Sequence, residues 1–167
     1  RVAAAVRDTH ADAVIGVGGG SLMDIAKATA HETGARMVMC PTAASTDAPC
    51  SALSIVYTEQ GAVSRVLKLG RNPDAVVVDT AVIVQAPVRT LVAGMGDALA
   101  TYFEADSCRQ KHAPTCAGED ASSITADALA ALCHTTLLRY GVLALAANEA
   151  RAVVPAFEHV VEANTLL

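Results

Sequence analysis

The stretch Asp12-Ala13-Val14-Ile15-Gly16-Val17-Gly18-Gly19-Gly20-Ser21 decides the fold of the first half of the chain. A short apolar run ends in consecutive glycines, and residues 22–32 then resume with helical spacing, which predicts a strand, a turn and a helix. Gly34 is placed to cap that helix, and residues 35–40 form a second apolar run. Because a helix joins the two strands, they are expected to pair in parallel within an α/β layer.

More strands are expected after the polar segment 41–51. Residues 52–57 and 62–69 alternate apolar and polar side chains around a turn at 58–61, which predicts a β-hairpin. Residues 75–78 have the composition of a further buried strand.

The character of the sequence changes from Pro87 onward, where Ala and Leu recur at three- and four-residue intervals. Helices are expected after Pro87, over 120–138 and over 144–165, the last interrupted at Pro155. The pattern therefore predicts an α/β part over residues 1–86 and an all-α part over residues 87–167.

Composition limits the classes of function. Hydrophobic residues make up 53% of the 167 residues, which is ample for a core. A net charge of -5 without clustered Lys and Arg argues against a nucleic-acid partner. No apolar run approaches the roughly 20 residues that a membrane helix needs, so no membrane partner is expected.

The cysteines point to a reducing compartment. Their number is odd and no Cys-x-x-Cys pair occurs, which fits neither a disulfide framework nor a zinc ribbon and favours the cytoplasm. They are Cys40, Cys50, Cys108, Cys116 and Cys133.

The glycine turn is the first candidate binding element. Glycines between a strand and a helix let the backbone approach a ligand, and the amides of the helix N-terminus suit a pyrophosphate. Gly16, Gly18 and Ser21 do not reproduce the dinucleotide fingerprint, because its third glycine is absent. A purely structural turn is the alternative. Asp24 is consistent with an ordinary acid in the first helical turn, where the helix dipole favours a negative charge.

The segment Pro41-Thr42-Ala43-Ala44-Ser45-Thr46-Asp47-Ala48-Pro49-Cys50-Ser51 is the second candidate. It lies between two strand-like runs, and Asp47 is its only charged residue, a composition that suits a polyhydroxylated ligand. The alternative is that Asp47 and the hydroxyls bind nearby backbone amides in turns.

Asp97 is the third candidate, in the run Gly94-Met95-Gly96-Asp97-Ala98-Leu99-Ala100-Thr101. Its carboxylate is consistent with a helix N-cap or with one ligand of a metal ion. The five histidines show no His-x-x-x-His spacing, and none is assigned as a ligand.

Three motifs taken together resemble the glycerol dehydrogenase branch of the iron-containing alcohol dehydrogenase superfamily. The first is Gly18-Gly19-Gly20-Ser21-Leu22-Met23-Asp24-Ile25-Ala26-Lys27, the second is the segment 41–51, and the third begins at Gly96 and runs to Ala105. Asn72-Pro73 and Val161-Glu162-Ala163-Asn164 extend the resemblance toward the end of the chain.

The resemblance implies a dehydroquinate synthase-like architecture, in which an α/β domain (1–86) binds NAD and an all-α domain (87–167) binds metal. It implies that glycerol is oxidised at C2 to dihydroxyacetone, with Asp47 contacting glycerol and Asp97 binding zinc. It also implies a cytoplasmic homo-oligomer. The dinucleotide would be held by Gly19, Gly20 and Ser21 at the pyrophosphate and by Thr42, Ser45, Ser51, Leu53 and Tyr57 elsewhere.

Zinc is expected rather than iron, because the iron-dependent relatives carry a histidine where this sequence has Thr101. The resemblance also implies that both domains are incomplete here, since the first nucleotide-binding strand and two zinc-binding histidines of the family fall outside residues 1–167. The chain is accordingly expected to be an inactive internal fragment by itself. Two alternatives stay open: a non-catalytic remnant that binds nucleotide or joins an oligomer, and another alcohol dehydrogenase of the superfamily.

Overall fold

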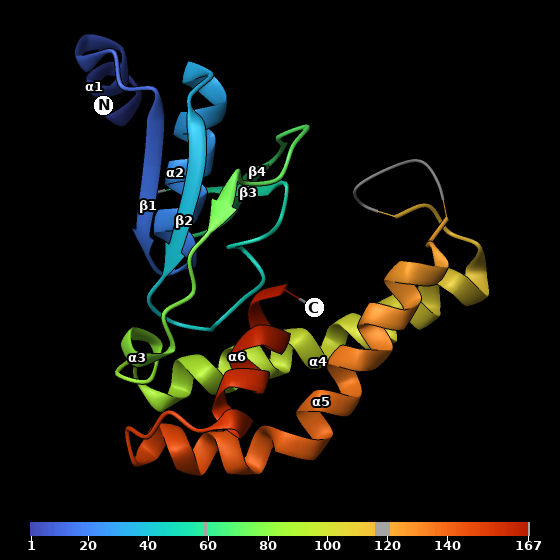
Figure 1. The fold of residues 1–167 in the computed structure, drawn as a ribbon. Coiled ribbons are helices and arrows are strands. Elements are labelled where there is room, and N and C mark those ends of the chain that lie inside the picture. Colours follow the sequence, from blue (N-terminus) through green and yellow to red (C-terminus); the bar gives the residue numbers. More distant parts are fainter. Residues whose placement is uncertain (59, 116–120, 167) are drawn as a thin grey trace. The chain divides into compact units, whose positions relative to one another are not determined.

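The computed structural model describes residues 1–58, 60–115 and 121–166, and the chain divides into two compact units (Figure 1). The first, called the strand unit, comprises Arg1–Thr42 and Ala48–Asp79. The second, called the helical unit, comprises Ala43–Asp47 and Thr80–Leu167. The polar segment 41–51 is thus shared, because its middle clusters with the helices and both of its ends cluster with the strands.

The described secondary structure alternates first and is then helical. The strand unit contains α1 (Val2–Thr9), β1 (Ala13–Gly18), α2 (Gly20–Thr33), β2 (Arg36–Pro41), β3 (Leu53–Tyr57), β4 (Val63–Lys68) and β5 (Ala75–Val76). The helical unit contains α3 (Thr80–Ile83), α4 (Val88–Lys111), α5 (Ile124–Glu149) and α6 (Pro155–Leu166).

The parallel layer predicted from the glycine stretch is confirmed. Strands β1, β2 and β5 form one sheet in that order, and β1 pairs with β2 in parallel from Ala13 opposite Arg36 to Gly18 opposite Pro41. Helix α2 makes the crossover and buries Met23, Ala26 and Ala30 with Met37 and Met39 of β2. Parallel strands need a crossover of about a dozen residues or more, and α2 supplies it.

Strand β5 is shorter than the predicted strand 75–78. Only Ala75 and Val76 pair with β2, and neither is buried, while Val77 and Val78 are 54% and 40% exposed, so the expectation of a buried strand over 75–78 is wrong. Val77 still donates its backbone N–H to the carbonyl of Met39 at 2.8 Å. An apolar composition therefore does not ensure that a segment is buried.

The predicted hairpin is present as a separate two-stranded sheet. Strand β3 pairs antiparallel with β4 from Leu53 opposite Lys68, with an irregularity between Val56 and Tyr57. At its tip Gly61 has φ 80° and donates its N–H to the carbonyl of Thr58, whereas Glu59 of the predicted turn lies outside the described residues.

The helical unit is built on the packing of α4, α5 and α6 against one another (Figure 1). Their buried apolar side chains include Leu91, Leu137, Phe157 and Val160. The expected break between helices at 138 and 144 is absent, because α5 runs without interruption. Gly141 lies in that stretch, and a Cβ there would come within 2.7 Å of the Met95 methyl carbon. Gly141 therefore does not end the helix, and a Cβ at this position would displace only the flexible end of the Met95 side chain.

The ends of these helices also correct the expectations. Helix α5 begins at Ile124, where the Ser123 hydroxyl accepts a hydrogen bond from the amide of Ala126, and the predicted start at Asp120 lies outside the described residues. Pro155 does not interrupt the last helix but is its first residue. Proline suits that position because its missing N–H would have no partner there.

One described helix, α5, is long and apolar enough by length and composition to cross a membrane. Helices in the core of a globular unit pass the same test. Cys133, Leu137, Ala144 and Ala147 of α5 are buried against the other helices.

Apolar side chains remain exposed in both units. On β1, Ile15 and Val17 are exposed on the face opposite α2, and on α5 Leu138 and Val142 are exposed. Exposed apolar side chains that gather into a large patch usually mark a surface that another layer of protein covers.

Asp74 lies between β4 and β5, and its side chain binds this connection to β2. Its carboxylate accepts the backbone N–H of Met37 at 2.7 Å and forms an ion pair with Arg71 at 2.8 Å, while Arg71 also donates to the carbonyl of Ala35. The Met37 amide bond, followed by Arg71, holds the pKa of Asp74 below its ordinary value of 3.8. The ionised form is therefore the one that the folded state favours.

A lowered pKa means that Asp74 stabilises the fold above about pH 4 and that this contribution is lost as the pH falls through the folded-state pKa. Asp74→Asn is expected to lower Tm at neutral pH, with a difference from wild type that shrinks toward about pH 2. Thermal unfolding of both proteins across this range provides the measurement. A difference independent of pH would contradict the role of the charge.

Candidate functional site

The glycine turn leaves the N-terminus of α2 open. Gly18 has φ 154°, a backbone conformation that side chains rarely permit, and Gly19 caps the helix with no heavy atom within 4 Å of where its Cβ would lie. Among the described residues, no side chain caps the first turn of α2, and the amides of Gly20 and Ser21 have no acceptor within the helix. Unpaired amides, the helix dipole and free space together suit a phosphate group.

Gly16, by contrast, does not contribute to this site. A Cβ at Gly16 would lie 2.8 Å from the Cβ of Ala26, so this glycine permits the close approach of α2 to β1. Glycine is therefore needed for a different reason at each position: close packing at Gly16, backbone conformation at Gly18 and open space at Gly19.

A buried lysine holds the end of the polar segment to α2. The side chain of Lys27 is fully buried, and its Nζ donates to the carbonyl of Ala48 at 2.8 Å and to the Ser51 hydroxyl at 3.2 Å. Nζ also lies 3.7 Å from the Asp24 carboxylate. A buried ammonium is tolerated only with such partners, so these contacts determine where residues 48–51 lie.

Asp24 extends this attachment to the hairpin. Its carboxylate accepts the backbone N–H of Ile55 at 3.1 Å, and its carbonyl accepts the Ser54 hydroxyl at 2.9 Å. The interpretation of Asp24 as an ordinary acid of the first helical turn is therefore wrong. Sequence reasoning missed both Asp24 and Lys27 as supports, because Asp and Lys three residues apart also occur as a routine surface pair.

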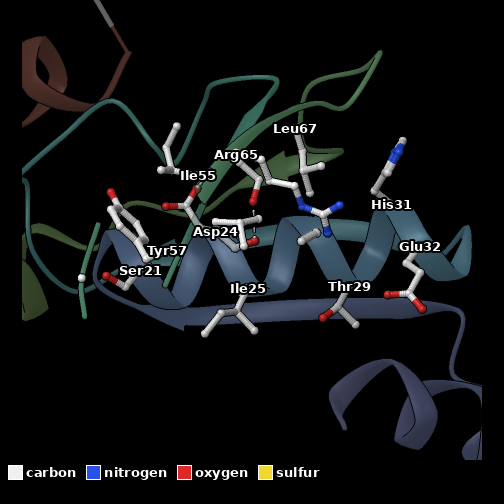
Figure 2. A pocket seen from close by; sticks show the side chains of 14 residues that line it. Ser21, Asp24, Ile25, Thr29, His31, Glu32, Ile55, Tyr57, Arg65 and Leu67 are labelled. Carbon is white, nitrogen blue, oxygen red and sulfur yellow. Dashed lines mark hydrogen bonds between the residues drawn. The ribbon is translucent and has the colours of Figure 1, made fainter. Parts of the chain in front are cut away.

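A groove of about 1000 Å³ runs between α2 and the hairpin within the strand unit (Figure 2). Ser21 and Tyr57 lie together at one end, while His31 and Glu32 lie farther along α2. The structure therefore brings two of the predicted dinucleotide residues onto one surface. Arg65 and Leu67 of β4 form part of the opposite wall.

The other predicted dinucleotide residues of the strand unit lie near the same elements. Thr42 follows β2, and its N–H donates to the carbonyl of Gly18 at 3.0 Å, next to the glycine turn. Ser51 is bound to Lys27, and Leu53 opens β3 and is half-buried. Unlike Ser21 and Tyr57, these three residues do not line the groove.

Ser45 and Asp47, by contrast, belong to the helical unit. Ser45 is half-buried and Asp47 is exposed, with the Thr46 hydroxyl donating to the Asp47 carboxylate at 3.4 Å. That long contact leaves carboxylate oxygen positions available to a ligand.

Asp97 lies inside α4 rather than at its beginning. The helix starts at Val88, so the N-cap interpretation is wrong, and the Asp97 carboxylate is exposed on the helix surface. Within the described residues it forms no ion pair, and the Thr101 hydroxyl reaches only its backbone carbonyl. Gly94 and Gly96 are likewise internal to the helix.

A complete zinc centre is not formed by this part of the chain. No three His, Cys, Asp or Glu side chains come together among the described residues, whereas a catalytic zinc site has three protein ligands. Asp97 fits the role of one zinc ligand, but the described residues do not supply the other two protein ligands that a catalytic zinc site needs.

Comparison with known proteins identifies the class. Residues 1–80 match the family model of the iron-containing alcohol dehydrogenases. A glycerol dehydrogenase of Thermotoga maritima is 57% identical over 160 residues, covering 96% of this chain and 44% of that protein. A glycerol dehydrogenase of Escherichia coli O6:H1 is 52% identical over 93% of this chain and 42% of its own length.

Comparison with solved structures agrees with the sequence comparison. The crystal structure of a probable glycerol dehydrogenase from Sinorhizobium meliloti 1021 matches with a TM-score of 0.96 and 48% identity, over 99% of this chain and 46% of that one. The chain belongs to the iron-containing alcohol dehydrogenase family and has part of its dehydroquinate synthase-like fold. Within that family, the relatives just described are glycerol dehydrogenases. The chain spans less than half the length of these relatives.

The attachment at Lys27 gives a test of stability. Lys27→Met removes the buried charge but keeps similar length, leaving Ala48, Ser51 and Asp24 without their ammonium partner, and is expected to cost about 3–5 kcal/mol of unfolding free energy. Urea denaturation measures this loss. The exposed Lys68→Gln is the control and should stay within about 0.5 kcal/mol. A Lys27→Met protein as stable as this control would show that the contacts are not stabilising.

Proposed function

We propose that the protein containing this chain is an NAD-dependent glycerol dehydrogenase that oxidises C2 of glycerol and forms dihydroxyacetone. The similarity to glycerol dehydrogenases over almost the whole chain carries this proposal. The open glycine turn at the start of α2 supports it independently, because its amides and free space suit a pyrophosphate.

The residue roles follow the family motifs. Gly19, Gly20 and Ser21 would hold the pyrophosphate through backbone amides and a hydroxyl. The remaining dinucleotide contacts would come from Thr42, Ser45, Ser51, Leu53 and Tyr57. Residues 1–86 would thus form the NAD-binding domain and residues 87–167 the metal-binding domain, each in part.

Asp47 would bind glycerol. Its exposed carboxylate is an acceptor for two hydroxyl donors, a chemistry that orients a polyol without reacting with it. NAD supplies the acceptor for the hydride that leaves C2. This chain would then contribute residues that orient the alcohol and residues that hold the dinucleotide.

Asp97 would be one ligand of a zinc ion whose other ligands lie outside the described residues. Zinc rather than iron is proposed because Thr101 stands where iron-dependent relatives have a histidine. The complete protein would be a cytoplasmic homo-oligomer.

The proposal is tested on the product of the gene that contains this chain, expressed with zinc. Reduction of NAD is followed with glycerol and with a panel of other alcohols. Glycerol as the preferred substrate supports the proposal, whereas preference for a different alcohol would favour another dehydrogenase of the family. NAD binding without oxidation of any alcohol would favour a non-catalytic role.

Asp97→Asn is expected to remove zinc and activity together, because an amide binds zinc far more weakly than a carboxylate. Zinc content by mass spectrometry and NAD reduction are measured on the same sample. Glu104→Gln removes another exposed acid from α4 and should retain both. Full zinc content in Asp97→Asn would refute the ligand assignment.

Asp47→Ala is expected to raise KM for glycerol by about 10- to 100-fold, since a hydrogen bond to a charged group is worth about 1.5–3 kcal/mol. KM for NAD should change less than about twofold because the pyrophosphate contacts are elsewhere. Steady-state kinetics with each substrate varied separates the two effects. Equal increases in both KM values would argue that Asp47 supports the whole site rather than glycerol.

A further inference from the structure

The segment Ala43–Asp47 is attached to the helical unit through Ala44. The Ala44 side chain is 1% exposed and lies in the same apolar core as Ile83, Leu91 and Phe157. A loop of small and polar residues therefore has one apolar anchor in a helical core, three residues before Asp47.

Asn164 of α6 binds the backbone at this anchor. Its Nδ2 donates to the carbonyl of Ala44 at 2.9 Å and to the carbonyl of Leu91 at 3.3 Å. Its Oδ1 is buried without a hydrogen-bond partner among the described residues. A reversed amide would place this oxygen against two carbonyl oxygens, so the donors set the orientation, and an unpaired buried acceptor is the cost.

Gly94 of α4 allows the backbone of Ala44 to lie close to this helix. A Cβ at this position would lie 2.1 Å from the Ala44 carbonyl oxygen and 2.6 Å from Asn164 Nδ2. Real side chains do not tolerate such distances, so only glycine lets the loop backbone rest directly on α4. Gly96, on the same helix, has no heavy atom within 4 Å of its Cβ position and carries no such constraint.

We infer that Asn164 and Gly94 are positioning residues, which hold the segment bearing Asp47 at a set distance from the helix bearing Asp97. Asp47 follows Ala44 by three residues, and Asp97 follows Gly94 by three residues, so one backbone contact lies equally close in sequence to both carboxylates. The inference rests on the proposed function for its consequence, because these are the glycerol and zinc positions. Neither Asn164 nor Gly94 is expected to touch substrate.

The kinetic test uses Asn164→Asp and Gly94→Ala in the product of the gene that contains this chain. The carboxylate loses the donor and repels both carbonyl oxygens, while the alanine displaces the loop by its volume. Both variants are expected to raise KM for glycerol at least about tenfold, since small misplacements of reacting groups are costly, with zinc content and KM for NAD within about twofold.

Two matched controls separate positioning from general damage. Asn148→Asp also replaces a buried asparagine that donates to a backbone carbonyl, that of Val84, but this contact does not involve residues 43–47. Gly96→Ala adds the same methyl group to α4 in open space. Both controls should leave KM for glycerol within about twofold of wild type.

Hydrogen exchange provides a readout that does not depend on activity. Amides of residues 43–47 should exchange faster in Asn164→Asp and Gly94→Ala than in the controls, because their anchor is weakened. Unchanged exchange there, or an unchanged KM for glycerol in a folded variant, would overturn the inference. If Asn164→Asp does not fold, Gly94→Ala decides. If wild type does not oxidise glycerol, the proposed function fails and exchange alone decides whether the contact holds the loop.

Discussion

The buried ammonium of Lys27 is the interaction on which the architecture of the strand unit depends. It joins α2 to the carbonyl of Ala48 and the hydroxyl of Ser51, and its neighbour Asp24 joins α2 to the hairpin through Ile55. A charge that is fully buried is strongly unfavourable without its partners, so the loop and hairpin cannot move away from α2 at small cost. The helix whose N-terminus is open thereby also positions the strands beside the groove.

In the helical unit, the polar segment is held by a close backbone contact with a helix rather than by a buried charge. Gly94 admits the backbone of Ala44, because a Cβ at this position would lie 2.1 Å from the Ala44 carbonyl oxygen. The contact exists because a side chain is missing, and a single added carbon would displace the loop backbone. Asn164 then satisfies the Ala44 carbonyl that the close approach buries, which is why an amide rather than an apolar residue suits that position.

Much of the fold was readable from local patterns. The apolar run before the glycines and the helical spacing after them predicted the parallel pair, and alternation predicted the hairpin, because these periodicities reflect which faces are buried. The errors arose where composition is ambiguous. Val77 and Val78 resemble buried strand residues but are exposed, and the expected break between helices at 139–143 lies within the uninterrupted helix α5. Neither outcome is visible without the neighbouring elements.

For the candidate site, the sequence by itself determined which residues can carry chemistry: the glycine turn, the hydroxyls with Asp47, and Asp97, each in a motif shared with a known family. Tertiary structure decided what holds them, namely that Lys27 and Asp24 are buried supports, that Asp97 is not an N-cap, and that residues 43–47 cluster with the helices. The physical reason is that residue type sets which bonds a side chain can form, whereas burial and long-range proximity set which bonds it must form.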